Sequence, residues 1–211
     1  MPNYYLQYAI YLTILAAGCI TGSIFYKGDK KILPVIIILG YTFISQSCSV
    51  LCAKYFRNNM PVEHIYMMVS TALWGWFFYT NNEDGKIRVI IKWLTLALVT
   101  FYVINTLFIQ HINTFPDNSM KLATLFNLVG GSVLLIQMLD LPAKENVFKN
   151  PLFLVAVGLV WFNTISSLYF FLKTFLTQYK IYPSVIILIH LISNYVYYLI
   201  LFMAMFFVKK D

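Results

Sequence analysis

Charged side chains are scarce in this chain. Of its 211 residues, 11% are Asp, Glu, Lys or Arg, whereas soluble domains carry about 25%. Hydrophobic residues make up 60% of the sequence, and the mean hydropathy is +0.74. A soluble fold of this composition would expose large apolar patches and aggregate. The lack of charge therefore excludes a water-soluble domain and predicts an integral membrane protein in contact with the lipid bilayer.

The chain also lacks a basic cluster, although its formal net charge is +7. Its Lys and Arg residues occur singly or in pairs at the ends of apolar runs. Nucleic-acid-binding domains instead gather their cations on one face or along one helix. We therefore expect no nucleic-acid partner and interpret the cations as a signal for membrane orientation.

Cysteine is limited to Cys19, Cys48 and Cys52, all within apolar runs. An odd number of cysteines in such runs does not form a disulfide framework. Cys48 and Cys52 are one helical turn apart and could bind a soft metal, but packing as small hydrophobic side chains is the better interpretation. No cofactor is predicted.

No polar stretch is long enough to form a separate soluble domain. Seven apolar stretches instead reach the roughly 20 residues that a transmembrane helix needs. Pro61, Pro151 and Pro183 fall at or near the first turns of three of them, where proline costs no hydrogen bond. The sequence thus predicts an all-α, seven-transmembrane helix bundle in one domain, with spans at residues 4–26, 32–55, 61–80, 89–109, 122–141, 151–172 and 183–208.

The cationic residues divide unequally between the two sides of such a bundle. Ten of the 15 fall on one side and five on the other. The positive-inside rule places the richer side in the cytoplasm, so the N-terminus is outside and the C-terminus inside. The richer side holds Lys27, Lys30, Lys31, Lys86, Arg88, Lys92, Lys144, Lys149, Lys209 and Lys210, and the other holds Lys54, Arg57, Lys121, Lys173 and Lys180.

Polar side chains gather in the half of the spans that this orientation places near the outside. Amides, carboxylates and imidazoles are costly in hydrocarbon unless they face a partner or water. Six spans contribute such groups at one depth, which predicts a polar cavity open to the outside; mutual hydrogen bonding between helices is the alternative. The candidate ligand-binding residues are Gln46, Glu63, His64, Tyr66, Asn105, Asn127, Asn163, His190 and Asn194.

The histidines lack any spacing typical of a metal site. His64, His111 and His190 all fall in the outer half, and with Glu63 or Asp117 they could supply ligands for a divalent metal. However, the sequence contains no H-E-x-x-H motif. We therefore predict no metal site. For His64 and His190, contact with a ligand or proton and structural hydrogen bonds are favoured over metal binding.

One short motif bears on self-association. Gly18 and Gly22 form a G-x-x-x-G pattern in the first span. Such glycines allow helices to approach closely, within one bundle as well as between subunits. Homo-oligomerisation through this span is therefore one of two interpretations.

Three segments resemble a group of small, uncharacterised seven-helix membrane proteins of Bacteroidota-type bacteria. They are Asn59-Met-Pro-Val-Glu-His-Ile-Tyr66, Pro151-Leu-Phe153 and His190-Leu-Ile-Ser-Asn-Tyr-Val-Tyr197. The likeness extends over most of the chain but rests on short motifs. It implies the seven-helix topology and a location in the bacterial inner membrane, and it implies no activity.

The function favoured by these observations is that of a receptor-like or sensory module. It would bind a small or lipid-like ligand from the outer side and contact a cytoplasmic or membrane protein through its short basic loops. The first alternative is a membrane enzyme acting on a lipid, with Glu63, His64 and His190 as acid–base groups or metal ligands. A small transporter or pore is the second, although broken helices and internal repeats are not evident.

Overall fold

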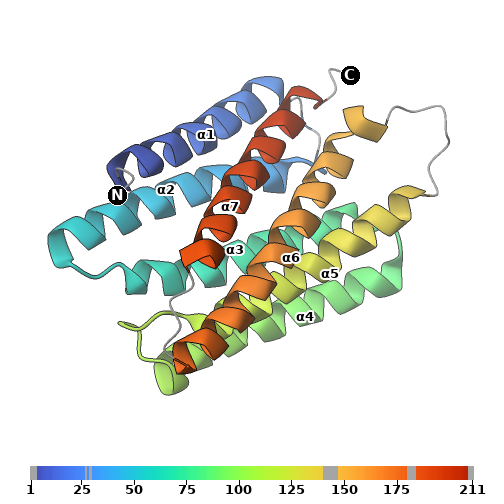
Figure 1. Cartoon of the computed structure of the whole chain (residues 1–211). Helices are drawn as coiled ribbons and strands as arrows, with labels where there is room; N and C mark the ends of the chain where they lie inside the picture. The colour runs from blue at the N-terminus through green and yellow to red at the C-terminus, as the bar shows by residue number, and fades with distance from the viewer. Residues whose placement is uncertain (1–3, 27, 29, 140–146, 180–183, 209–211) are drawn as a thin grey trace.

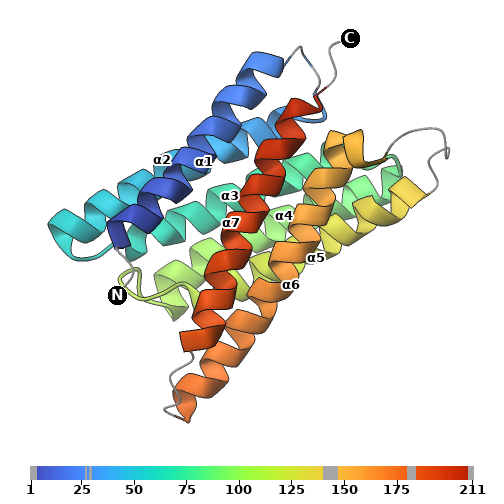
Figure 2. The same cartoon turned by 45° about the horizontal axis from the view of Figure 1, so that its top comes forward.

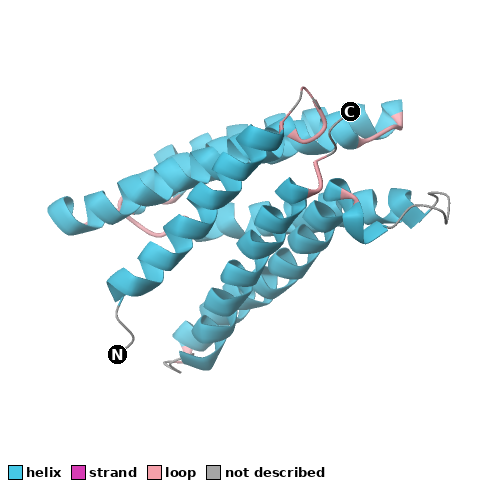
Figure 3. Cartoon of the chain, turned by 90° about the horizontal axis from the view of Figure 1, so that it is seen from above, coloured by secondary structure: helices cyan, strands magenta, loops and turns pink. Residues whose placement is uncertain are grey.

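The structure, a computed structural model, describes residues 4–26, 28, 30–139, 147–179 and 184–208 (Figure 1). These residues form helices joined by short loops and contain no strand (Figure 3). A π-helical turn, Asn105–Ile109, continues α4, and a 3-10 turn, Val147–Lys149, precedes α6. The prediction of an all-α fold is confirmed. The long helices are α1 (Tyr4–Phe25), α2 (Leu33–Phe56), α3 (Met60–Asn81), α4 (Gly85–Ile104), α5 (Asp117–Leu139), α6 (Pro151–Gln178) and α7 (Ser184–Phe206).

Three helix boundaries differ from the predicted spans because helices extend beyond the apolar stretch. α4 begins at Gly85 rather than at residue 89, and the Asp84 side chain caps it by accepting a hydrogen bond from the Lys86 amide at 2.7 Å. α5 begins at Asp117 rather than at residue 122, with its acidic residue in the first turn, where the helix dipole favours it. α6 continues to Gln178. Hydropathy therefore located the apolar parts of these helices but not their ends.

Six of the long helices are long and apolar enough to cross a membrane, by length and composition. The exception is α3, which has 22 residues but a lower hydropathy. Its polar side chains are largely buried within the bundle, including those of His64, Ser70 and Thr71. Burial against other helices explains how α3 carries polar residues, and its crossing of the membrane remains a prediction.

Six helices close into a ring around the centre of the bundle. Each of the pairs α1–α2, α2–α3, α3–α5, α5–α6, α6–α7 and α7–α1 is in contact. Figure 2 shows α7 between α1 and α6, which closes the ring between the first and last parts of the chain. α4 lies outside the ring and packs mainly against α3. Consequently α4 contributes little to the interior and exposes much of its apolar surface.

Apolar side chains fill the half of the ring nearest the end of α7. Leu15 of α1, Leu39 of α2, Leu159 of α6 and Leu201 of α7 are fully buried there and belong to one hydrophobic cluster. Met205, one turn further along α7, is also fully buried in this cluster. This half corresponds to the one predicted to have hydrocarbon-like packing.

Gly18 and Gly22 serve packing within the bundle. A Cβ atom at Gly18 would lie 3.2 Å from Leu39, and one at Gly22 would lie 2.9 Å from both Ile36 and Met205. The two glycines therefore let α1 approach α2 and α7. The G-x-x-x-G pattern is accounted for inside one chain, and homo-oligomerisation remains a prediction without this motif to support it.

The cysteines are free, as expected, but they do not all pack inside. Cys48 is exposed on α2, whereas Cys19 and Cys52 are half-buried. The expectation of core packing is therefore wrong for Cys48, whose side of α2 faces out of the ring. The predictions that involve Lys27, Lys144, Lys180, Pro183, Lys209 and Lys210 concern positions outside the described residues.

Adding a methyl group at Gly130 should destabilise the bundle. Its Cβ would lie 2.5 Å from the Phe78 ring, which Trp74, Phe77 and Phe126 surround. We expect Gly130→Ala to lower the free energy of unfolding by about 1–3 kcal/mol, as overpacking does. Circular dichroism during denaturation in detergent measures this change.

Gly85→Ala is the matched control, because nothing lies within 4 Å of a Cβ atom there. This control should leave stability unchanged or slightly raise it, since Ala favours helices over Gly. Equal stability of the Gly130 and Gly85 variants would contradict the proposed packing.

Candidate ligand-binding cavity

A cavity of about 220 Å³ lies within the ring. All six ring helices line it and α4 does not. The lining residues are Tyr11, Ile38, Gln46, Glu63, Tyr66, Met67, Ser70, Trp74, Met120, Ala123, Thr124, Asn127, Phe162, Asn163, Phe170, His190, Asn194, Tyr197 and Tyr198.

Most of the predicted ligand-binding residues meet in this cavity. Those that line it are Gln46, Glu63, Tyr66, Asn127, Asn163, His190 and Asn194. His64 and Asn105 do not line it, and the helix that brings the sixth set of side chains is α1 instead of α4. Position along the spans thus grouped residues that line one cavity. It did not show that the side chains of His64 and Asn105 point away from that cavity.

Glu63 is the only carboxylate that the described part of the chain brings to the cavity lining. It lies in the first turn of α3, where the helix dipole favours a negative charge. The Ser49 hydroxyl donates a hydrogen bond to its Oε1 atom at 2.8 Å, and the Asn59 amide donates to the Ser49 hydroxyl at 2.8 Å. Among the described residues, no Lys or Arg forms an ion pair with Glu63. Its charge therefore has no counter-ion from this part of the protein.

Four amide side chains reach the cavity from four different helices. Gln46 comes from α2, Asn127 from α5, Asn163 from α6 and Asn194 from α7. Asn163 donates a hydrogen bond to the Leu159 carbonyl of its own helix at 2.8 Å. Within the described chain no hydrogen bond joins any two of these amides, and the buried Oδ1 atom of Asn127 has no partner. Mutual hydrogen bonding between helices therefore does not account for this group.

His190 is held within a stack of aromatic rings. Its imidazole is nearly parallel to the Tyr169 ring, with centroids 4.3 Å apart, and it also stacks on Phe162 at 5.7 Å. Its Nδ1 atom lies 3.4 Å from the Ser166 hydroxyl, and Phe162 in turn stacks on Tyr197 at 4.8 Å. These contacts fix the imidazole on the α6–α7 side of the cavity.

A group of tyrosines forms another part of the wall. The rings of Tyr11 and Tyr198 meet edge to face with centroids 5.3 Å apart, which joins α1 to α7. The Tyr66 hydroxyl lies 3.4 Å from that of Thr42, and both lie close to the Tyr198 hydroxyl. The phenol groups thus place polar atoms on a wall that is otherwise aromatic.

His64 has a structural environment outside the cavity. Its side chain is buried, and its Nε2 atom donates a hydrogen bond to the Thr114 carbonyl at 3.0 Å. Its Nδ1 atom lies 2.8 Å from the Thr106 hydroxyl. Because both ring nitrogens are engaged by the end of α4 and the loop after it, His64 ties that loop to α3. The expectation that His64 contacts a ligand in the cavity is not supported by its position.

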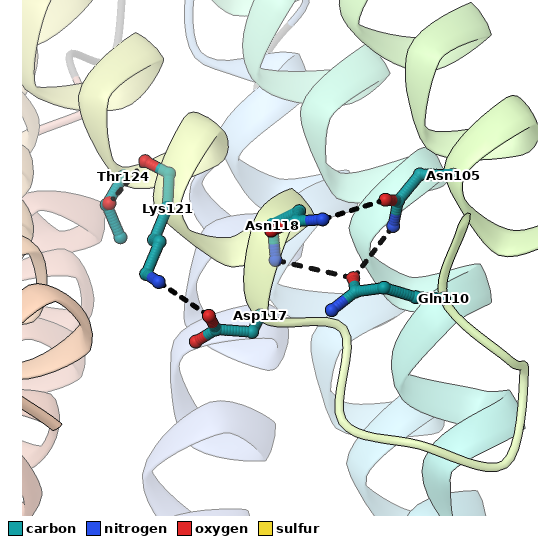
Figure 4. A network of polar contacts seen from close by, with 6 residues as sticks. All are labelled: Asn105, Gln110, Asp117, Asn118, Lys121 and Thr124. Carbon is teal, nitrogen blue, oxygen red and sulfur yellow. Dashed lines mark hydrogen bonds and ion pairs between the residues drawn. The ribbon is translucent and has the colours of Figure 1, made fainter. Parts of the chain in front are cut away.

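Asn105 belongs to a second polar network, shown in Figure 4. Its amide nitrogen donates to Gln110 Oε1 at 2.8 Å, and its Oδ1 atom accepts from the Asn118 amide at 3.1 Å. Nearby, Lys121 and Asp117 form an ion pair across one turn of α5. The network joins the π-helical turn to the start of α5. For Asn105, hydrogen bonding between helices is therefore the correct alternative.

Sequence reasoning missed several aromatic lining residues. Tyr11, Trp74, Tyr197 and Tyr198 line the cavity but were not among the candidate ligand-binding residues. Tyr11 lies two turns inside α1, about 10 Å from its start at the helical rise. A phenol so far from the helix end needs a polar partner in the bundle, and that depth was the available signal.

Metal chemistry finds no support among the described residues. They contain no group of three or more His, Cys, Asp or Glu side chains placed to hold a metal ion. His64 and His190 have the separate environments described above, and His111 is exposed on the loop after α4. Comparison with protein families, with curated proteins and with solved structures finds no match for this chain.

Removing the His64 side chain should weaken the fold without altering the cavity wall. His64→Ala loses two buried hydrogen bonds and leaves the Thr114 carbonyl without its donor, so we expect a loss of about 2–4 kcal/mol in unfolding free energy. Denaturation in detergent measures the loss. His111→Ala, at an exposed site, is the control and should change stability by less than about 1 kcal/mol. Equal effects of the two substitutions would contradict the structural role of His64.

Proposed function

We propose that this chain is a receptor-like or sensory membrane module that binds a small molecule, or the small polar part of a lipid, inside the helical ring. The observation that carries the proposal is the convergence on one cavity of a carboxylate, an imidazole and four amides that, in the described part of the chain, form no hydrogen bonds with one another. Ligand sites typically combine apolar and aromatic walls with a few convergent polar groups. The cavity has this composition, with Glu63, His190 and four amides among aromatic and aliphatic side chains.

The volume of the cavity limits the ligand. A space of about 220 Å³ is below the 300–1,000 Å³ of sites for drug-sized molecules. A complete phospholipid does not fit, whereas a small metabolite or a head group does. We therefore propose a ligand of this smaller class.

The orientation proposed for the module has its N-terminus outside and its C-terminus in the cytoplasm of a bacterium, in the inner membrane. Its support is the unequal division of the cationic residues. In this orientation the cavity lies in the outer half and the basic loops, including the one with Lys30 and Lys31, face the cytoplasm. A cytoplasmic or membrane protein partner would contact those loops.

A lipid-acting enzyme is the second candidate, because Glu63 and His190 line the same cavity. A carboxylate and an imidazole can act together as acid and base if both reach the substrate. The proposed binding role is preferred, because His190 is stacked between two rings and His64 lies elsewhere. Loss of a measurable hydrolytic activity in Glu63→Gln, with ligand binding retained, would favour the enzyme.

Reporter fusions test the orientation. Green fluorescent protein fused after the C-terminal residue should fluoresce in bacterial cells, and alkaline phosphatase fused there should be inactive, because the C-terminus is cytoplasmic. Fusion after Asn113, in the loop following α4, is the control and should give the reverse result. The opposite pattern at both positions would contradict the orientation and the outer position of the cavity.

Filling the cavity tests binding. Ala123 lies in the cavity wall and is buried, so Ala123→Phe should occupy much of the space and abolish retention of a bound small molecule. Native mass spectrometry of the detergent-purified protein measures retention. Ala97→Phe makes the same change at an exposed site on α4 and should leave retention unchanged. The proposal would be contradicted if the wild-type protein retained no bound molecule under any growth condition and if no added ligand stabilised it.

A further inference from the structure

The cavity has an unbalanced electrostatic character. Among the described residues, Glu63 is the one acidic side chain in its lining, and no Lys or Arg lines it. In the described part of the protein, the Glu63 carboxylate meets the Ser49 hydroxyl and forms no ion pair. A partly buried carboxylate without a counter-ion favours a positively charged group in the adjoining space, because water there is limited and screening is weak.

The aromatic wall favours the same kind of ligand. Seven of the nineteen lining residues are Phe, Trp or Tyr. Aromatic faces attract ammonium groups through the ring quadrupole, most strongly where the cation is desolvated. Phenol oxygens, such as those of Tyr66 and Tyr198, can also accept hydrogen bonds from a cation.

One acceptor in the wall needs a hydrogen-bond donor. The Asn127 Oδ1 atom is buried and has no partner among the described residues. A buried acceptor left without a donor is costly. A ligand that carries N–H groups supplies that donor, whereas a carboxylate or phosphate ligand does not.

From these three features we infer that the cavity selects a small protonated amine, with its ammonium group beside Glu63 and its apolar part against the aromatic wall. This inference rests on the proposed function, namely that the cavity binds a small molecule. It goes further by assigning the charge and the hydrogen-bonding character of the ligand.

A cation beside the aromatic stack of His190 does not remove this preference. Lys173 on α6 does not line the cavity, and its ammonium lies 4.0 Å from the centroid of the Phe115 ring and 5.8 Å from that of Tyr169. It is therefore engaged with rings behind the stack that holds His190. An anionic ligand would be repelled by Glu63, and no Lys or Arg among the described lining residues would offset that repulsion.

Matched compounds test the inference on the full-length wild-type protein in detergent. Phenethylamine, 2-phenylethanol and phenylacetate share one scaffold and differ in the charge of one group; butylamine, 1-butanol and butyrate form a second such set. Thermal unfolding with each compound, followed by calorimetric titration, measures stabilisation and affinity. We expect an amine to raise Tm and to bind at least about tenfold more tightly than the alcohol and carboxylate of its set.

Substitution of Glu63 isolates the charge. Glu63→Gln keeps the shape and can still accept a hydrogen bond from Ser49, and it should weaken amine binding by about tenfold or more. Glu83→Gln makes the same change at an exposed loop position and should leave amine affinity unchanged. The comparison of compounds on the wild-type protein decides the question even if Glu63→Gln does not fold.

The outcomes separate the inference from the proposed function. The alcohol or carboxylate of a set could bind as tightly as its amine, or more tightly, and lose that binding in Ala123→Phe. This result would overturn the amine preference but would still support ligand binding in the cavity. Undiminished amine binding by a folded Glu63→Gln protein would also overturn it. If no compound of any charge binds, both the amine preference and the proposed function are contradicted.

Discussion

The cost of placing polar side chains in an apolar environment governs the arrangement of this bundle. α3 is the one long helix of the described chain whose apolar stretch falls short of the hydropathy that a membrane span needs, and it carries Glu63 and His64 in its first turns. It lies against α2, α4 and α5, so most of its surface meets protein. α3 is one member of the ring, and the cavity forms where Glu63 and Ser70 of this helix face the interior.

Two adjacent side chains on α3 point in different directions and therefore have different roles. Glu63 and His64 are neighbours in sequence, and consecutive side chains on a helix point about 100° apart. Glu63 faces the ring and lines the cavity, whereas His64 faces the end of α4 and the loop after it. One side of α3 thus contributes to a candidate site, and the next side holds the fold together.

The sequence predicted the long helices well because apolar stretches separated by short polar loops leave few other structures. It located helix ends poorly at α4, α5 and α6, where helices continue into polar segments capped by their own residues, such as Asp84. The depth of polar residues identified the cavity, because depth follows from position along a span. The direction of Asn105 could not be read in the same way, since it depends on the packing of α4 outside the ring, which the sequence does not show.

The aromatic content of the cavity was hidden by the abundance of aromatic residues elsewhere. The chain contains 16 Tyr and 18 Phe, and most such residues in membrane proteins lie at interfaces or in cores. Only contacts between distant segments, such as that of Tyr11 with Tyr198, distinguish those in the cavity wall. Such contacts form because α1 packs against α7 and closes the ring. The hydrophobic pattern of the sequence does not specify which helices pack together.

The position of α4 outside the ring has a mechanical consequence. A Cβ atom at Gly75 of α3 would lie 2.2 Å from Thr95 Oγ1 of α4, so the two helices are in very close contact there. At the same end, Arg88 donates a hydrogen bond to the Asn82 carbonyl between the helices at 2.5 Å. α3 is therefore shared by the cavity wall and by this outer helix. Any tilt of α3 that widens or narrows the interior therefore moves α4 and its basic first turn with it.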